Sequence, residues 1–256
     1  MKIATYNVNG IRAAITKGLF EWVDEQDFDV LCLQETKAEE SQIDESVLDN
    51  AGYHHYWHSA EKKGYSGVAT FTKTPATQVI AGMNNQKYDS EGRILRTDFG
   101  DITLLNCYFP SGSSGEDRHE FKMQFLADFA PWIETLKKER PNLIIVGDYN
   151  IVHKEIDIHN PERKDNPSGY RPEERAWMDD WFGKMGFTDA FRWLHSEQQD
   201  VYSWWSYRAG SRQKNKGWRI DYISVSDTLK DRVQSVVHYP HVLHSDHCCI
   251  EMEMEE

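Results

Sequence analysis

Residues 143–161 of this 256-residue chain read LIIVGDYNIVHKEIDIHNP and combine an apolar run with acidic and amide side chains. The run 143–146 is typical of a short buried strand, and Gly147 ends it where the backbone must turn. Asp148 and Asn150 follow two positions apart, so an extended backbone points both side chains the same way. Open α/β sheets bind ligands at such strand ends. Gly, Asp and Asn are also common in plain turns, so other residues must decide between the two interpretations.

Polar side chains follow or interrupt apolar, strand-like runs elsewhere in the chain as well. They are Asn7, Asn9, Glu35, Tyr108, Asp221, and Asp246 with His247. Each of them could be a hydrogen-bonded structural group. An unpaired buried polar group costs about 1–3 kcal/mol, so the repeated placement is hard to explain as capping alone. We therefore expect these side chains to meet in one cleft.

The residue types in this set indicate hydrolysis assisted by a hard cation. Carboxylates without cysteine partners suit Mg²⁺, which takes one or two protein carboxylates together with phosphate oxygens. Glu35 is the best candidate for a metal ligand, and Asp246 is the second. Asp148 could deprotonate an attacking water molecule. His247 could donate a hydrogen bond to a phosphoryl oxygen, and Asp221 is the candidate that fixes its tautomer.

Strands and helices must position these side chains, and the apolar patterns predict where they lie. We expect a hairpin over residues 94–110 with its turn at Gly100 and Asp101, and strands within residues 2–9, 29–37, 63–73, 201–208, 217–226 and 249–255. We expect helices over residues 18–26, 121–136 and 172–186, with Pro131 as a kink or break in the second. The predicted strands alternate with helices in the first half of the chain and cluster together in the second half. This order predicts an α/β fold of two mostly antiparallel sheets packed together, with helices outside.

Length and composition favour one soluble, cytoplasmic domain over residues 1–256, and we expect a monomer without membrane association. The sequence shows no linker, repeat, signal-peptide pattern or apolar stretch near 18 residues. Its four cysteines lack CxxC spacing and are expected to be reduced and buried. The net charge of −13 argues against holding nucleic acid through bulk charge. Residues 208–219 nevertheless contain basic and no acidic side chains, so a local basic strip is still open.

Ten motifs in colinear order resemble the exodeoxyribonuclease III and AP endonuclease family of the endonuclease/exonuclease/phosphatase superfamily. They are NVNGIRA, LQETK, KGYSGVA, EGR, YFP, GDYNIVHKEIDIHNP, GYRPEER, YSWWSYR, GWRIDY and SDHC, and they run from residue 2 to the end of the chain. The resemblance implies a four-layer α/β sandwich with two mixed sheets face to face. It also implies Mg²⁺-dependent hydrolysis of the phosphodiester 5′ to abasic sites in duplex DNA, with Mn²⁺ as a possible substitute. Many members also remove damaged 3′ ends or act as 3′→5′ exonucleases.

The resemblance implies roles for the polar residues at the strand ends. Glu35 falls on the metal-binding glutamate of the family. Asn9 stands where members carry Asp or Asn, so this chain lacks a second carboxylate ligand there. Asp246 is therefore the more important candidate for a further ligand. Asn7 is also expected in the metal site. The catalytic set matches Tyr108 at the scissile phosphate, Asp148 and Asn150 at the nucleophile, and His247 with its orienting Asp221.

The resemblance also implies a set of DNA-binding residues. Trp204, Trp218 and Ile220 would form an apolar niche for a flipped-out, baseless sugar; without the resemblance, a hydrophobic core under a loop is the simpler interpretation. Arg208 would enter the duplex. Residues expected to contact the DNA backbone near the cut are Arg12, Tyr65, Arg93 and Asn160. The register of residues 111–118 is uncertain, so no residue is assigned there.

Two other functions must be weighed against a repair nuclease. A phosphoinositide phosphatase or sphingomyelinase of the same superfamily would keep the GDxN and SDH motifs, but would not account for WWSYR and GWRIDY. A catalytically dead DNA-binding or scaffold protein should have lost some of the catalytic residues, and all of them are present. Within the preferred function, the sequence leaves open whether abasic-site cleavage or 3′→5′ exonuclease activity dominates.

Overall fold

The strands form two six-stranded sheets in a computed structural model that describes residues 1–163, 165 and 167–255. Sheet A contains, in spatial order, β11 (Val233–His238), β12 (Ile250–Met254), β1 (Lys2–Asn7), β2 (Val30–Gln34), β4 (Val68–Thr72) and β3 (His54–His58). Sheet B contains β5 (Gln78–Ala81), β6 (Ile94–Phe99), β7 (Ile102–Tyr108), β8 (Asn142–Asp148), β10 (Asp221–Ser226) and β9 (Phe187–Asp189). The pairs β1/β2 and β7/β8 are parallel, and antiparallel pairs predominate.

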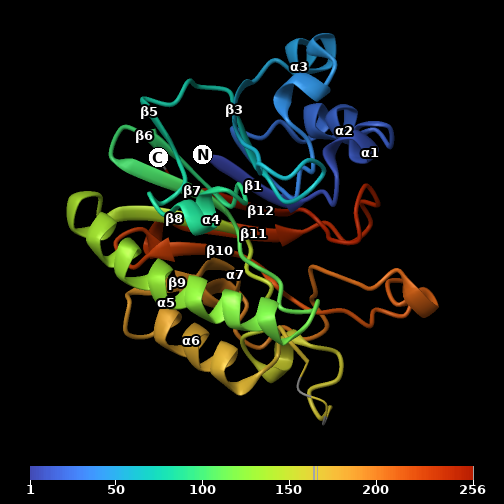
Figure 1. Cartoon of the computed structure of the whole chain (residues 1–256), viewed down its shortest axis with the longest axis vertical. Coiled ribbons are helices and arrows are strands. Elements are labelled where there is room, and N and C mark those ends of the chain that lie inside the picture. The colour runs from blue at the N-terminus through green and yellow to red at the C-terminus, as the bar shows by residue number, and fades with distance from the viewer. Residues whose placement is uncertain (164, 166, 256) are drawn as a thin grey trace.

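The helices are distributed over the outer faces of the two sheets. On the side of sheet A are α1 (Ile11–Ile15), α2 (Leu19–Gln26) and α3 (Glu45–Ala51). On the side of sheet B are α5 (Glu116–Glu139) and α6 (Pro172–Phe182). Shorter elements are α4 (Gln86–Asp89), α7 (Ala190–Leu194) and the 3₁₀ turns η1 (Glu40–Gln42), η2 (Glu155–Asp157), η3 (Arg208–Gly210) and η4 (Lys230–Arg232). Figure 1 shows α5 and α6 side by side below the strands and α1 to α3 above them.

The alternation of side chains along each strand builds three apolar layers. In β8, Ile144 and Val146 point between the sheets, whereas Leu143 and Ile145 point toward α5 and α6. On the far side of sheet A, Leu31 and its neighbours pack against α1, α2 and α3. Successive residues of a strand point to opposite faces, so a continuous apolar run covers both. The four-layer α/β sandwich expected from the sequence is thereby confirmed.

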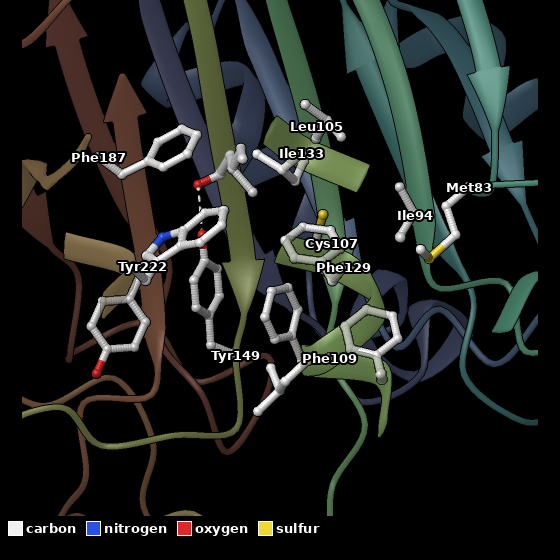
Figure 2. Close-up of a cluster of buried hydrophobic side chains, with 14 of the residues drawn as sticks. Met83, Ile94, Leu105, Cys107, Phe109, Phe129, Ile133, Tyr149, Phe187 and Tyr222 are labelled. Carbon is white, nitrogen blue, oxygen red and sulfur yellow. Dashed lines mark hydrogen bonds between the residues drawn. The ribbon is translucent and has the colours of Figure 1, made fainter. Parts of the chain in front are cut away.

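The outer core beside sheet B is rich in aromatic rings. Figure 2 shows Phe109 and Tyr149 with their rings side by side, and these rings stack 4.3 Å apart with an angle of 8° between their planes. Phe109 follows β7 and Tyr149 follows β8, so the stack packs the two strand ends against each other. Burial of such large rings provides much of the stabilisation at this end of the sheet.

Several elements agree with the sequence-based expectations, and others differ, among them β5, β9 and β11, which were not expected. The hairpin is β6 and β7, and the predicted helix over residues 121–136 is part of α5, which continues through Pro131 rather than breaking. The predicted strand at residues 201–208 is wrong, because strand-like pairing there is limited, among the described residues, to isolated bridges of Trp204 with Trp218 and His247. β3 was not expected, because its sequence HHYWH lacks a clear apolar alternation. The four cysteines are free and buried.

Among the described residues, no helix is long and apolar enough to cross a membrane.

Candidate active site

The strand ends of both sheets meet at one edge of the sandwich. β1, β2, β7 and β8 finish there, and β10, which is antiparallel to β8, begins there. The register pairs Tyr108 with Asp148 across β7 and β8, and Asp148 with Asp221 across β8 and β10. These three side chains therefore stand in one row, as the placement of polar residues at strand ends predicts.

The end of β8 depends on a glycine, Gly147, which was expected to end the strand but lies one residue before its last residue, Asp148. Gly147 has a φ of 134°, and a Cβ atom at this position would lie 1.9 Å from the carbonyl oxygen of Cys107. Any side chain would therefore collide with the neighbouring strand β7. The close approach of the two backbones brings Asp148 level with the end of β7.

His247 and Asp221 form a hydrogen-bonded pair behind the site. Nδ1 of His247 lies 2.9 Å from Oδ2 of Asp221. The Nδ1–H group therefore donates to the Asp221 carboxylate. Nε2 faces Asp148, whose Oδ2 is 3.9 Å away. Burial alone would lower the pKa of His247, but the charge and hydrogen bond of Asp221, with Asp148 and Asp246 nearby, raise it to about 10. At neutral pH the imidazole is a cation that can stabilise negative charge on a phosphate.

Asp148 is a buried carboxylate surrounded by amide donors. Its Oδ1 accepts the backbone N–H of Asn150 at 2.8 Å. Its Oδ2 accepts the side-chain amides of Asn7 at 2.9 Å and Asn150 at 3.2 Å. Burial, together with the Asp221 carboxylate, raises the pKa of Asp148 to about 7, although His247 and the donors from Asn150 and Asn7 act in the opposite sense. A carboxylate with a pKa near neutrality is suited to accept a proton from water.

Asn7 connects the two sheets inside the site. Its Nδ2 donates to Asp148 on sheet B and also to Oε2 of Glu35, at 3.1 Å, next to sheet A. Its Oδ1 accepts the backbone N–H of Asn9 at 2.9 Å. With both ends of the amide engaged within the protein, Asn7 orients Glu35 and Asp148. The expectation that Asn7 belongs to the metal site stays a prediction.

Glu35 and Asn9 converge on a position that already attracts a cation. Nζ of Lys37 lies 2.9 Å from Oε1 of Glu35 and 2.5 Å from Oδ1 of Asn9. The two oxygens therefore point at one place, as the ligands of a hard cation must. Glu35, Asn9 and Lys37 all have positive φ angles of 47° to 55°. Such strain in non-glycine residues is concentrated at functional sites. The oxygen donors that converge here are of the type that a divalent metal binds.

Asp246 lies on the other side of Asn9. Its Oδ1 accepts the side-chain amide of Asn9 at 2.9 Å, and its Oδ2 accepts the indole N–H of Trp204 at 3.0 Å. Burial alone would raise the pKa of Asp246, but His247 and these donors lower it. Asp246 therefore stays charged beside Asn9, the residue whose Oδ1 contacts Lys37.

Among the described residues, a second group of acidic and histidine side chains in this site is close enough together to hold a metal ion. In Asp148, Asp221 and His247, one ligand atom from each lies within 4.8 Å of the others. These three could hold a metal ion, but Nδ1 of His247 is already engaged by Asp221. The sequence-based choice of Glu35 with Asp246 and this buried group are therefore two neighbouring candidates within one site.

A cavity of about 510 Å³ opens over this cluster. Most of the residues expected from the sequence line it, and the lining is Asn9, Glu35, Tyr65, Arg93, Tyr108, Ser111, Ser113, Ser114, Arg118, Asp148, Asn150, Pro167, Ser168, Trp204, Trp218, Ile220, Asp246 and His247. Asn7 and Asp221 are buried behind it. Burial, with Glu35 and Asp148 nearby, raises the pKa of Tyr108 well above its usual value, so its phenol keeps its proton and can donate.

One wall of the cavity is apolar. Trp204 and Trp218 pack edge to face with ring centres 5.9 Å apart, and Ile220 lies in the same small cluster. Trp204 also donates to Asp246, so the aromatic wall adjoins the acidic cluster directly. The expected niche and the expected strand-end cluster therefore lie in one cavity.

The cavity lining also contains two arginines that are largely engaged within the protein. Arg93 is only 2 % exposed and donates to Glu91, to the carbonyl of Tyr108 and to the hydroxyl of Tyr65. Arg118 donates to Glu91 and to the same hydroxyl. Both guanidinium groups stand close to Tyr65. Arg93 thus presents a charge held by internal partners instead of a free side chain.

Three further predicted residues lie outside the described cavity lining. Arg12, Asn160 and Arg208 are exposed. Arg208 belongs to η3, on the loop that projects from the body of the molecule in orange in Figure 1.

The basic strip suggested by residues 208–219 is smaller than the sequence indicates. Arg219 is 1 % exposed and forms ion pairs with Asp157 at 2.8 Å and Asp189 at 2.7 Å. Arg212 donates to backbone carbonyl oxygens, including that of Ser245 at 2.7 Å. These two side chains are structural, and the exposed positive charge in this segment comes from Arg208, Lys214 and Lys216.

Sequence reasoning missed some residues around the cavity. Lys37, within the motif LQETK, follows Glu35 by two positions, but its contact with Asn9 depends on the folded turn. Arg118 and the serines of residues 111–114 lie within residues 111–118, whose register was uncertain, and the structure places Arg118 in α5. Ser168 lies between two assigned motifs and gave no signal of its own.

The fold and the site together define a class of phosphoester hydrolases, and comparisons with known proteins agree. A model of the Endonuclease/Exonuclease/phosphatase family matches residues 4–247. The chain is 40% identical to an exodeoxyribonuclease of Bacillus subtilis over 98% of each sequence. It is 37% identical to the DNA repair nuclease APEX1 of Danio rerio, over 98% of this chain and 81% of that one.

Solved structures give the same result. The chain superimposes over the full length of both molecules on an AP endonuclease from Archaeoglobus fulgidus, with a TM-score of 0.90 and 27% identity. A 3′ phosphatase from Neisseria bound to a product DNA hairpin has a TM-score of 0.92 and 25% identity, again over both whole chains. The chain belongs to the endonuclease/exonuclease/phosphatase family, and within it the resemblance to exodeoxyribonuclease III and AP endonucleases is confirmed.

Proposed function

We propose that this protein is a DNA repair nuclease that cuts duplex DNA on the 5′ side of abasic sites. It also removes nucleotides or blocking groups from 3′ ends, and it works with Mg²⁺, which Mn²⁺ can replace. Its relatives include an exodeoxyribonuclease and a DNA repair nuclease. We further propose that residues 1–256 act as one domain and as a monomer.

The observation that carries this proposal is the shared cavity. The polar cluster of Asp148, His247 and Asn150 lies on its floor, and the apolar niche of Trp204 and Trp218 forms an adjoining wall. A phosphodiester next to a baseless sugar would place its phosphate at the polar cluster and its sugar in the apolar niche. A normal nucleotide carries a base that the niche would have to accommodate as well.

The side chains have complementary tasks in the proposed reaction. Asp148, with its raised pKa, accepts a proton from water and aligns that water with the phosphorus atom. His247, as a cation held by Asp221, stabilises the negative charge that develops on the phosphoryl oxygens. The neutral phenol of Tyr108 donates to the same phosphate. The amide of Asn150, which donates to Asp148 and to the carbonyl oxygen of Phe109, orients the base toward the nucleophile.

Glu35 and Asn9 would hold the metal, with Asp246 behind Asn9. When bound there, a divalent ion would supply Lewis-acid stabilisation of the phosphate charge. Asn7 would keep Glu35 and Asp148 at a fixed separation, because one amide group contacts both carboxylates.

The test uses two labelled duplexes, one with an internal abasic analogue and one with a recessed 3′ end. Each is incubated with Mg²⁺ and then with EDTA. We expect cleavage 5′ to the analogue and shortening of the recessed end, both stopped by EDTA. A protein that cleaves neither duplex with Mg²⁺ or Mn²⁺ present would contradict the proposal.

The Asp148→Asn variant tests the assignment of the base. Loss of general-base assistance typically lowers the rate by about 10²–10⁴-fold. We expect that loss on both duplexes, with unchanged thermal unfolding because the amide keeps the shape of the side chain. Cleavage close to the wild-type rate would remove Asp148 from the mechanism.

A second candidate is a member in which activity at 3′ ends predominates. The observation in its favour is the close structural likeness to the 3′ phosphatase from Neisseria. A third duplex ending in a 3′ phosphate, compared with the other two at equal concentration, gives the order of preference.

A further inference from the structure

A lysine and a glutamate form a fully buried ion pair between α5 and α6. The side chains of Lys122 and Glu174 are both 0% exposed, and Nζ lies 2.5 Å from Oε1. Lysine and glutamate are rarely buried completely, because removing their charges from water is costly. Replacing such a pair by neutral groups of similar volume often leaves stability unchanged or higher. Stability alone is therefore a weak reason for this pair.

The lysine end of the pair reaches the turn that carries the proposed catalytic residues. Nζ of Lys122 donates to the carbonyl oxygen of Asn150 at 2.7 Å. Asn150 has a φ of 54°, in the left-handed region that non-glycine residues rarely adopt. Its backbone N–H and its side-chain amide both contact Asp148. The ammonium group therefore holds the peptide immediately beyond the donors that orient Asp148.

The glutamate end reaches the wall of the cavity. Oε2 of Glu174 accepts the backbone N–H groups of Gly169 at 2.7 Å and Arg171 at 2.9 Å. Ser168, which lines the cavity, donates to Oε1 at 3.3 Å. One carboxylate thus fixes three positions within the segment 168–171.

The segment 168–171 packs directly on the turn at Asn150. A Cβ atom at Gly169 would lie 3.0 Å from the carbonyl oxygen of Asn150, the same oxygen that Lys122 contacts, and 3.1 Å from the ring of Trp218. The ion pair therefore connects the floor of the cavity, at Asn150, with the niche, at Trp218. Lys122 and Glu174 are the internal link between these two parts.

We infer that Lys122 and Glu174 are positioning residues for phosphodiester hydrolysis, holding the Asn150 turn and the cavity wall at residues 168–169 in one arrangement. This inference rests on the proposed function. Both side chains are fully buried, so they act through the backbone of Asn150 and Gly169 and do not touch substrate. A displacement of about 1 Å at a reacting group can lower a rate by about 10²-fold.

The test is the double variant K122M/E174Q. The introduced methionine fills a volume similar to that of lysine without the ammonium group, and the amide oxygen of the introduced glutamine can still accept the N–H groups of Gly169 and Arg171. No unpaired charge is left buried, so we expect cooperative unfolding within a few degrees of wild type. We expect kcat on the abasic duplex to fall about 10²-fold while KM changes less than about threefold.

An exposed ion pair at the end of α6 provides the matched control. Nζ of Lys184 lies 2.6 Å from Oδ1 of Asp180, and the two side chains are 81% and 54% exposed. Neither residue belongs to the cavity lining, so removal of this pair in D180N/K184M should leave kcat unchanged. Wild type and D148N are measured in the same assay, so a failed nuclease activity is distinguished from a failed positioning role.

The outcome separates positioning from packing. A folded K122M/E174Q protein with wild-type kcat would overturn the inference, as would an equal loss in the exposed-pair control. If the double variant does not fold, K122M alone decides, because the Glu174 carboxylate keeps its donors from Ser168, Gly169 and Arg171 while the Asn150 carbonyl loses the ammonium group. We then expect kcat to fall about fivefold at constant KM, and an unchanged kcat would contradict the inference.

Discussion

Nδ2 of Asn7, at the end of β1, lies 2.9 Å from Oδ2 of Asp148, at the end of β8, although the two residues belong to different sheets. The same nitrogen donates to Glu35 at 3.1 Å. A single amide therefore sets the separation between the proposed metal ligand and the proposed base. The packing of the two sheets is in this way directly connected to the geometry of the site.

Asn7→Ala should disable the enzyme more than it destabilises the fold. Hydrogen bonds to charged groups are worth about 1.5–3 kcal/mol each, and this variant removes two of them from buried or half-buried carboxylates. We expect kcat to fall about 10²-fold. The free energy of unfolding in urea should fall by about 1.5–3 kcal/mol, because water can replace the bond to the half-buried Glu35 but not the bond to the buried Asp148. Asn142→Ala, which removes an exposed hydrogen bond to Asp101, serves as the control. Equal kcat values for the two variants would refute this role of Asn7.

Lys37→Met should tighten metal binding. The lysine ammonium is shared by Glu35 and Asn9, the two residues that we assign to the metal, so an incoming ion must displace it. Without this competitor we expect the Kd for Mn²⁺ to fall about tenfold, equivalent to about 1.4 kcal/mol. Calorimetric titration of the DNA-free protein measures it, with the exposed Lys63→Met as control. Weaker or unchanged binding would show that the ammonium does not occupy the metal position.

Stability without metal should fall as the pH rises above neutrality. Burial alone would lower the pKa of His247, but Asp221 outweighs it and raises the folded-state pKa from 6.5 to about 10. A raised pKa contributes stability that is complete below pH 6.5 and is lost as the pH passes through the folded value near 10. Asp148 adds a loss of the same sign at lower pH, between 3.8 and about 7. Buried cysteines, whose pKa is raised above 9.0, lower stability in the upper part of the same range. The contribution of His247 between about pH 7.5 and 10 is therefore the difference between wild type and a variant without the imidazole.

The measurement is urea unfolding in EDTA at a series of pH values for wild type and His247→Gln. Glutamine can still donate to Asp221 but does not titrate, so its stability should change less over this window. Parallel curves for the two proteins would mean that His247 does not carry the extra proton.

Trp218→Ala should impair abasic-site cleavage beyond its effect on stability. Trp218 is half-buried and packs edge to face on Trp204, so we expect its truncation to cost about 1–2 kcal/mol, less than a fully buried tryptophan. Loss of the niche should lower kcat/KM on the abasic duplex by about 10–100-fold. Trp193→Ala, which removes an exposed tryptophan on α7, is the control. If the activity loss merely follows the fraction of unfolded protein, Trp218 has only a structural role.

The sequence by itself determined the composition of the site. Polar residues at the ends of apolar runs identified Glu35, Asp148 and His247, because a strand that is buried along its length can expose side chains only where it ends. The hairpin turn at Gly100 and the helix over residues 121–136 also followed from local patterns, since turn residues and helical spacing act within a few positions of the chain.

Only the tertiary structure decided how those residues are divided into roles. Arg219 lies in a basic stretch of sequence, yet it is buried against Asp157 and Asp189, which are distant in the chain. Asn7 reads like a metal ligand, but its amide is engaged by contacts across two sheets. Nothing in the local sequence distinguishes Lys122 from an exposed helix lysine. Its buried contact with Asn150 depends on how α5 packs against sheet B. Hydrogen bonds and ion pairs of this kind form between distant segments, so no local pattern can reveal them.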